Sequence, residues 1–243
     1  MVGTLCRMRA QYRAALFASR AAALVGLLAV LWAVVSVVNP AFATGMALRD
    51  VLTAAAPVLI VAVGVSLVML AGEIDISVGS MYGTLAAVLA LLSSPTVAGW
   101  PAWAVCVVVV AAGVACGLIN GVLVAWARVP AIVATLGTMS ILRGTTELLM
   151  GGEWITDLPA GMRAIGTGVW VGLPVMVWVA GVVVAAGVVL TRRTRFGVRL
   201  AAVGDRAEAA AYARVRVAWV KVAAFGVCGG LVARNVPLPA SIA

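Results

Sequence analysis

The chain contains 243 residues, of which 65% are hydrophobic and 10% are charged, and its formal net charge is +9. Because soluble domains average about 45–50% apolar and about 25% charged residues, this composition excludes a soluble globule and predicts an all-α integral membrane protein. Histidine is absent and the four cysteines are scattered, so we expect no metal site, no cofactor and no catalytic residue. The arginines stand between apolar runs, which is typical of membrane topology and excludes nucleic acid as a partner.

The N-terminal region combines a basic segment with the first apolar run. Residues 1–20 carry four arginines and no acid, and an 18-residue apolar run follows over 21–38. A secretory signal peptide is the alternative, because "AFA" at 41–43 is similar to a small-residue cleavage site. The run is longer than the core of a signal peptide and many apolar runs come after it, which favours a retained first helix.

Further apolar runs predict a polytopic bundle of about six to seven transmembrane helices. Glycines at four-residue spacing in two of these runs, Gly113, Gly117 and Gly121 in one and Gly79 and Gly83 in the other, predict close packing against neighbouring helices. The expected spans after the first are 51–71, about 76–92, a stretch within 97–127, 130–149, 168–190, and a run from Trp219 that fades by Leu231.

The distribution of basic residues predicts the orientation. With a cytoplasmic N-terminus, the segment 1–20, Arg128 and the segment 191–221 all lie inside, and together they hold thirteen of the seventeen basic residues. This is a positive-inside pattern. It predicts a multi-pass protein of the bacterial cytoplasmic (inner) membrane, and it places the polar stretch 150–167 in an extracytoplasmic loop.

Two of only eight acidic residues, Glu73 and Asp75, stand in "AGEIDISVGS" over 71–80, between two apolar runs. Residues two apart point to opposite sides, so they do not converge as an acid and a base do. A carboxylate at the centre of a helix in lipid is disfavoured by about 2.5–3.5 kcal/mol. The surrounding glycines and serines therefore favour a broken or re-entrant element near 72–80, which lines a pathway and faces the bundle interior. The alternative is a cytoplasmic hairpin whose acids have no role.

The segment 191–221 carries eight basic and two acidic residues. Asp205 is in a position to cap a helix, Glu208 follows three residues later and an alanine run comes next, so a short helix on the cytoplasmic face is expected to begin there. A docking element is the favoured interpretation. Attraction of the arginines to anionic lipid is the alternative, and both roles can coexist.

Three blocks in this order resemble the membrane-spanning permease subunits of bacterial ABC importers for monosaccharides, the ribose, xylose, rhamnose and galactose group. The resemblance extends over about residues 25–232, and the permease domain is expected to span 21–232, with the coupling loop at 191–217. The blocks are "GEIDISVGS" (72–80), "GLINGVLVAWARVPAIVATLGTMSILRGTTELLMGG" (117–152) and "RFGVRLAAVGDRAEAAAYARVRVAWVK" (195–221).

This resemblance implies that the chain is not an enzyme and that ATP is hydrolysed on a cytoplasmic ATP-binding subunit. The other implied partners are a periplasmic or lipid-anchored sugar-binding protein, a second permease subunit, identical or not, and the lipid bilayer. The residues expected to line the pathway are Glu73, Asp75, Ser77, Ser80, Asn120, Thr135 and Thr138. Those expected to couple to the ATPase are Gly204, Asp205, Arg206, Glu208, Ala209 and Ala210.

The sequence departs from the family pattern in the coupling loop and at its end. Arg206 and Ala207 replace the usual Asn-Pro, and Arg214 stands near the usual glycine. Residues 233–243 have lost apolar periodicity and are expected to be a non-family tail, as in a truncated reading. Two other functions stay open. An ion-coupled secondary transporter would use Glu73 or Asp75 on a broken helix, and a non-transporting scaffold would use the acids only as a loop.

Overall fold

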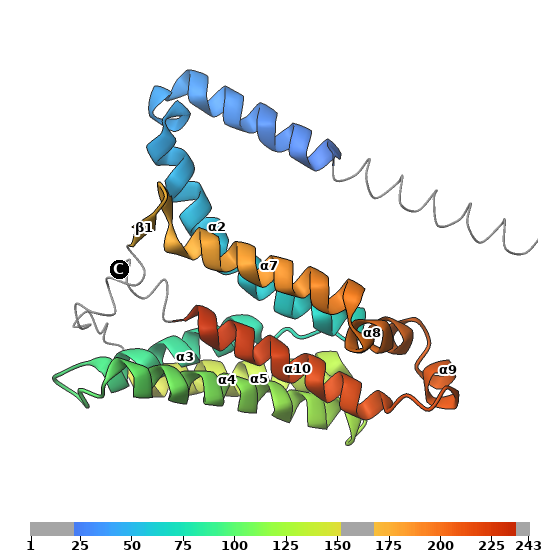
Figure 1. Ribbon diagram of the computed structural model, residues 1–243. Coiled ribbons are helices and arrows are strands. Elements are labelled where there is room, and N and C mark those ends of the chain that lie inside the picture. Colours follow the sequence, from blue (N-terminus) through green and yellow to red (C-terminus); the bar gives the residue numbers. More distant parts are fainter. Residues whose placement is uncertain (1–21, 152–167, 237–243) are drawn as a thin grey trace, which may run out of the picture. The chain divides into compact units, whose positions relative to one another are not determined.

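The computed structural model describes residues 22–151 and 168–236. Within these ranges the chain is built almost wholly from helices, which confirms the all-α prediction (Figure 1). The segment 1–20 and nearly all of the expected loop 150–167 lie outside the described residues. The chain divides into two compact units, residues 1–51 and 52–243.

The described part of the first unit is a helix, a tight turn and the first residues of the next helix. The helix spans Ala22–Val38 and matches the expected first apolar run. Asn39 ends it, and its Oδ1 accepts a hydrogen bond of 3.1 Å from the Ala41 amide. The 3-10 turn η1 (Pro40–Ala43) follows. Trp32 and Phe42 pack edge to face across this turn, with ring centroids 5.8 Å apart.

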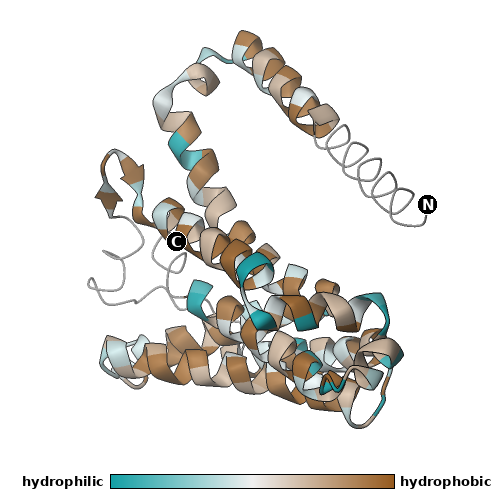
Figure 2. Ribbon diagram, turned by 45° about the vertical axis from the view of Figure 1, so that its right-hand side comes forward, coloured by the Kyte–Doolittle hydropathy of each residue, from teal (hydrophilic) through white to brown (hydrophobic). Residues whose placement is uncertain are grey.

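Long apolar helices lie close to the predicted spans, and most of their length is hydrophobic (Figure 2). Four have the length and composition to cross a membrane, namely α2 (Gly45–Leu70), α4 (Ala102–Ala125), α7 (Val175–Arg193) and α10 (Val217–Asn235). Two others are α3 (Val78–Ser93) and α5 (Ala131–Met150). Helix α2 begins six residues before the expected position 51, because Arg49 and Asp50 end the apolar run without breaking the helix. Helix α10 continues to Asn235 and does not fade by Leu231.

A β-hairpin replaces the first turns of the helix expected over 168–190. Strands β1 (Val169–Trp170) and β2 (Leu173–Pro174) pair antiparallel. The two residues between them, Val171 and Gly172, have φ of +50° and +77°, as a two-residue hairpin turn requires. Pro174 then precedes α7, so the apolar run predicted the right segment but the wrong start.

The tightest packing in the second unit joins α4 to α10, which lie side by side (Figure 1). A Cβ at Gly117 would come within 2.2 Å of the Phe225 carbonyl oxygen, and one at Gly121 within 2.7 Å of the Val222 Cα. The prediction of close packing is therefore confirmed for Gly113, Gly117 and Gly121. It is wrong for Gly79 and Gly83, because no described atom lies within 4 Å of a Cβ built at either position.

Candidate functional site

The acidic stretch interrupts regular helix between α2 and α3. Helix α2 ends at Leu70, and Gly72 follows with φ +81°. The Gly72 amide donates to the Met69 carbonyl at 3.0 Å and the Glu73 amide to the Val68 carbonyl at 3.2 Å. This is the hydrogen-bond pattern of a Schellman motif, which favours glycine at the left-handed position. The interruption spans 71–77, whereas 78–80 already belong to α3.

Asp75 begins a chain of hydrogen bonds that joins the interruption to α4 and α5, called here the polar network. The Ser77 amide and hydroxyl donate to Asp75 Oδ1 at 2.9 and 2.6 Å. Asn120 Nδ2 donates to Ser77 Oγ at 2.9 Å, and Thr138 Oγ1 donates to Asn120 Oδ1 at 2.6 Å. Four of the seven residues expected to line a pathway are thus brought together from three elements.

The polar network lies inside the helix bundle. Asn120 is five residues from the end of α4 and Thr138 is seven residues from the start of α5, so they lie about 7–10 Å inside these helix ends. Asp75 is 6% exposed, Ser77 and Asn120 are 0% exposed, and Asp75 Oδ2 has no hydrogen-bond partner within the described residues. The expectation that the stretch faces the interior is met by Asp75 and Ser77. Ile74 and Ile76, by contrast, are exposed.

Removing the Thr138 hydroxyl is expected to destabilise the chain. Thr138→Val keeps the side-chain shape but leaves Asn120 Oδ1 buried without its donor, which costs about 1–3 kcal/mol. Thr145→Val is the matched control on the same helix, because the Thr145 hydroxyl is exposed and bonds only the Ile141 carbonyl of its own helix. Thermal unfolding of the two purified variants in detergent measures the difference. Equal melting temperatures would show that the network contributes nothing.

Besides Glu73, two of the expected pathway residues lie outside the polar network. The Thr135 hydroxyl is buried and bonds the Ala131 carbonyl at 2.8 Å, which satisfies it within α5. Ser80 lies half-buried in the first turn of α3. Their expected role in a pathway stays a prediction.

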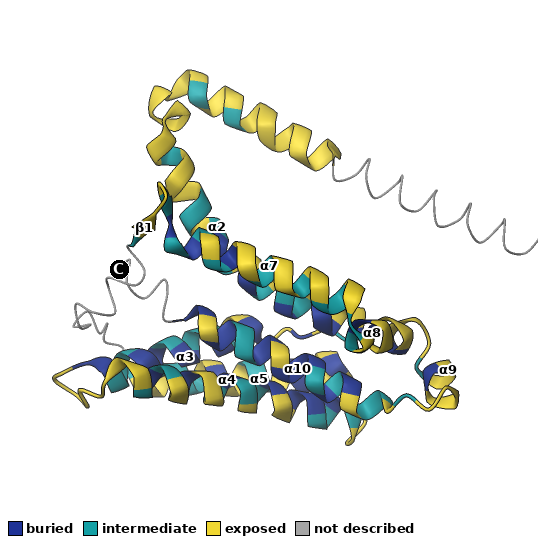
Figure 3. Cartoon of the chain, viewed as in Figure 1, coloured by how far each residue is buried: buried dark blue, intermediate teal, exposed yellow. Residues whose placement is uncertain are grey.

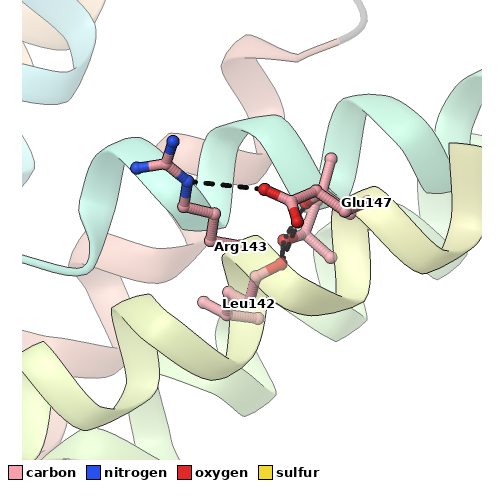
Figure 4. Close-up of polar contacts among 5 residues, drawn as sticks. Leu142, Arg143 and Glu147 are labelled. Carbon is pink, nitrogen blue, oxygen red and sulfur yellow. Dashed lines mark hydrogen bonds and ion pairs between the residues drawn. The ribbon is translucent and has the colours of Figure 1, made fainter. Parts of the chain in front are cut away.

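A second hydroxyl cluster, which the sequence reasoning missed, joins α3 to α5. Thr84 Oγ1 lies 2.9 Å from Thr146 Oγ1, and both hydroxyls bond the Leu142 carbonyl. Figure 4 shows the contacts of Leu142 next to an ion pair of Arg143 with Glu147, whose atoms are 3.6 Å apart. The pair is 77% and 73% exposed, so it contributes little to stability. Thr138 and Thr146 stand eight residues apart, which places both hydroxyls on one face of α5, and this spacing was the available signal.

Glu73 forms an ion pair with Lys221, the single lysine of the sequence. Their side chains are 16% and 18% exposed, and Lys221 lies in the second turn of α10. Glu73 and Asp75 therefore point to different partners, as the spacing predicts. Within the described residues, no group of three His, Cys, Asp or Glu side chains is placed to hold a metal ion.

The segment after α7 forms two short helices, α8 (Arg195–Asp205) and α9 (Ala207–Tyr212). Thr194 caps α8 by accepting from the Gly197 amide at 3.2 Å. Leu200 and Val203 of α8 are buried while its arginines are exposed, and Figure 3 shows both buried and exposed parts along α8. Asp205 is the last residue of α8, so the expectation that it caps a following helix is wrong. Arg206 precedes α9 without a side-chain cap.

The end of α8 touches the start of the acidic stretch through backbone atoms. A Cβ at Gly204 would come within 2.1 Å of the Leu70 carbonyl oxygen and 3.1 Å of the Gly72 amide. Gly204 thus lets α8 approach the end of α2, and its expected contact with an ATPase stays a prediction. After α9, Arg214 has φ +59°. This left-handed conformation favours glycine, which accounts for a glycine near this position in the resembled family.

Comparisons with known proteins place the chain in a family. Residues 47–233 match the family described as branched-chain amino acid transport system / permease component. The chain is similar to the autoinducer 2 import system permease protein LsrC of Salmonella typhimurium strain LT2 and of Escherichia coli strain K12 / DH10B. Both are 37% identical over 186 residues, which cover 76% of this chain and 53% and 54% of the relatives. The chain thus spans about half the length of these relatives. No solved structure matches it. The match over most of its length shows that the chain belongs to this family of transport-system permease components.

Proposed function

We propose that the chain is a membrane-spanning permease subunit of an ABC importer, and that it helps to form the pathway for a monosaccharide-like substrate. The single observation that carries the proposal is the contact of Gly204 with Leu70 and Gly72. This contact joins the helices α8 and α9 to the interruption at 71–77, which holds the buried Asp75. An importer driven by a separate ATPase needs a connection of this kind between a docking surface and its pathway. Family membership and the names of the relatives support the same class.

The partners follow from this assignment. A cytoplasmic ATP-binding subunit docks on α8 and α9, a substrate-binding protein delivers the sugar from outside, and a second permease subunit completes the pathway. The N-terminus and α8–α9 lie on the cytoplasmic side of the inner membrane, since most of the basic residues gather there. Asp75, Ser77, Asn120 and Thr138 face the pathway in at least one state of transport.

Exposed side chains on α8 and α9 mark the docking surface. Asp205, Arg206 and Glu208 are exposed, as is Ala209, whereas Ala210 is buried and packs against the core. Tyr212, at the end of α9, is 91% exposed. An aromatic side chain this open is typical of the residues that dominate binding at interfaces, so we add Tyr212 to the docking residues.

Tyr212→Ala is expected to lower recovery of the ATP-binding subunit with the tagged permease by at least tenfold, which corresponds to an interface residue worth about 1.4 kcal/mol or more. Val198→Ala is the matched control, because Val198 is also exposed but lies near the start of α8. Co-purification from membranes that contain the full import system measures the effect.

The same experiment separates the alternatives. If no ATP-binding subunit is recovered with the unsubstituted chain, and alanine at Asp205, Arg206 and Glu208 leaves uptake intact, the importer assignment is wrong. An ion-coupled carrier would import without any ATPase, and a scaffold would not import at all.

A further inference from the structure

Two tryptophans meet where α4 ends and α10 begins. Trp126 follows the last residue of α4, and Trp219 lies in the first turn of α10. Their rings pack edge to face with centroids 5.3 Å apart, yet the two residues are 52% and 56% exposed. Both helices are long and apolar enough to cross a membrane. Exposed indoles at the ends of such helices are typical of the headgroup level of a bilayer.

Two arginines flank this aromatic pair. Arg128 stays beside the last turn of α4, because the next residue, Val129, donates its amide to the Leu123 carbonyl at 3.1 Å. Arg216 directly precedes α10 and stands three residues before Trp219, which is close to one helical turn. Both arginines are exposed. Within the described residues neither forms an ion pair, so both charges are available to a ligand.

The beginning of α10 adds to this positive charge. Arg216, at the N-cap position, gives the helix no side-chain hydrogen bond, and the amides of Ala218 and Trp219 have no acceptor within the described residues. Free amides at a helix N-terminus attract an anion such as a phosphate. The two arginines and this helix end therefore form an anion-binding surface beside the exposed indoles.

An apolar surface continues from the aromatic pair along both helices. Ile119 stands seven residues before Trp126, on the same face of α4, and is 56% exposed. On α10, Val227 lies about two turns beyond the second indole and is also exposed. Leu118 connects the two faces, because a Cβ at Gly226 would come within 2.9 Å of its side chain. The surface thus changes from apolar to aromatic to basic, which is the order of acyl chain, ester and phosphate in a phospholipid.

We propose that the adjoining ends of α4 and α10 bind one anionic phospholipid. Its phosphate contacts Arg128 and Arg216, its ester groups lie against the two indoles, and an acyl chain runs along Ile119. A zwitterionic lipid would bring its own ammonium group next to the arginines, so a headgroup with net negative charge fits better. A protein docked on the arginines would leave the apolar surface along the spans uncovered. With the proposed orientation this end faces the cytoplasmic leaflet, which carries anionic lipids.

Native mass spectrometry of the full chain in detergent tests the site, because it counts each bound lipid. The chain is titrated with dioleoyl phosphatidylglycerol and with dioleoyl phosphatidylcholine, which have the same acyl chains and differ in net charge. We expect the first phosphatidylglycerol to bind at least about tenfold more tightly. Each arginine near a membrane surface contributes about fivefold in affinity, which corresponds to about 1 kcal/mol.

Substitutions locate the site on the chain. Arg128→Gln and Arg216→Gln should each lower the affinity for phosphatidylglycerol about fivefold, and Arg216→Lys should keep it within about twofold. Arg199→Gln is the matched control, because Arg199 is an exposed arginine without an ion pair in the described residues, on a helix that carries no tryptophan. It should leave the affinity unchanged. Trp219→Leu should weaken the binding of both lipids by the same factor, because the indole meets the ester groups that they share.

Four outcomes overturn the proposal. Equal affinity for the two lipids, or equal losses for Arg128→Gln and Arg199→Gln, would show general charge attraction in place of a site. Displacement of phosphatidylglycerol by excess inorganic phosphate would make the surface a site for a free anion. Unchanged lipid affinity when Arg128 and Arg216 are both replaced by Gln, together with loss of the ATP-binding subunit on co-purification, would make it a protein interface.

The titration needs neither ATP nor a transported substrate, so its result is independent of the proposed function. A chain that recovers the ATP-binding subunit but binds both lipids equally keeps the importer assignment and loses the lipid site. A chain that recovers no ATP-binding subunit but selects phosphatidylglycerol through Arg128 and Arg216 does the reverse.

Discussion

Gly117→Ala is expected to lower the free energy of unfolding by about 3 kcal/mol, and Gly117→Leu to abolish the folded chain. The added Cβ would lie 2.2 Å from the Phe225 carbonyl oxygen and 2.9 Å from its carbon. Because these are backbone atoms, no side-chain rotation relieves the overlap, and α4 has to move away from α10. Thermal unfolding of the chain in detergent, with monomer yield as a second readout, measures the effect.

Gly137→Ala is the control for this substitution. Gly137 is also a glycine inside a long helix, but no described atom lies within 4 Å of a Cβ built there. Alanine favours the helix over glycine by about 1 kcal/mol, so this variant should unfold at the same or a higher temperature. If both variants lose stability equally, the close approach of α4 and α10 does not determine stability.

Lys221→Met is expected to cost about 2–3 kcal/mol, the second largest effect. It leaves the Glu73 carboxylate in a site where that side chain is only 16% exposed, and an unpaired charge in such a site is costly. The figure is below the full cost of breaking a buried pair, because water still reaches both side chains. Urea or thermal unfolding measures it, and uptake should fall as the folded fraction falls.

A double-mutant cycle completes this test. Glu73→Gln combined with Lys221→Met removes both charges and should be more stable than Lys221→Met alone. The exposed pair of Arg143 and Glu147 is the internal comparison, because Arg143→Met should change stability by less than about 0.5 kcal/mol. Additive effects of the two changes at 73 and 221 would contradict the pairing.

The sequence predicts the helical architecture and most of the candidate site because both depend on local chemistry. Apolar runs of sufficient length define the helices, and glycine next to isolated acids indicates the interruption at 71–77. The hairpin at 169–174 was missed because Val169, Trp170 and Val171 are as apolar as a helix in this chain. What separates these three residues from a helix is the positive φ of Val171, and a valine at this position gives no sign of a positive φ.

Tertiary partners account for the remaining differences. Two glycine pairs with the same four-residue spacing behave differently, because α10 lies against Gly117 and Gly121, whereas no described helix lies against Gly79 and Gly83. Spacing defines a smooth helix face but not its neighbour. In the same way, the pairing of Glu73 with Lys221 joins residues 148 positions apart. The sequence supplied both charges without any sign that they would meet.

The approach of Gly204 to Leu70 and Gly72 has a mechanical consequence. Side chains yield under load by changing rotamers, but two peptide backbones in direct contact have nothing between them to compress. A displacement of the end of α8 is therefore passed to the end of α2 with little loss. Any larger residue at position 204 would place a side chain between the end of α8 and the end of α2. The two backbones would then no longer be in direct contact, and the rigid connection between the helices would be lost even in a chain that folds.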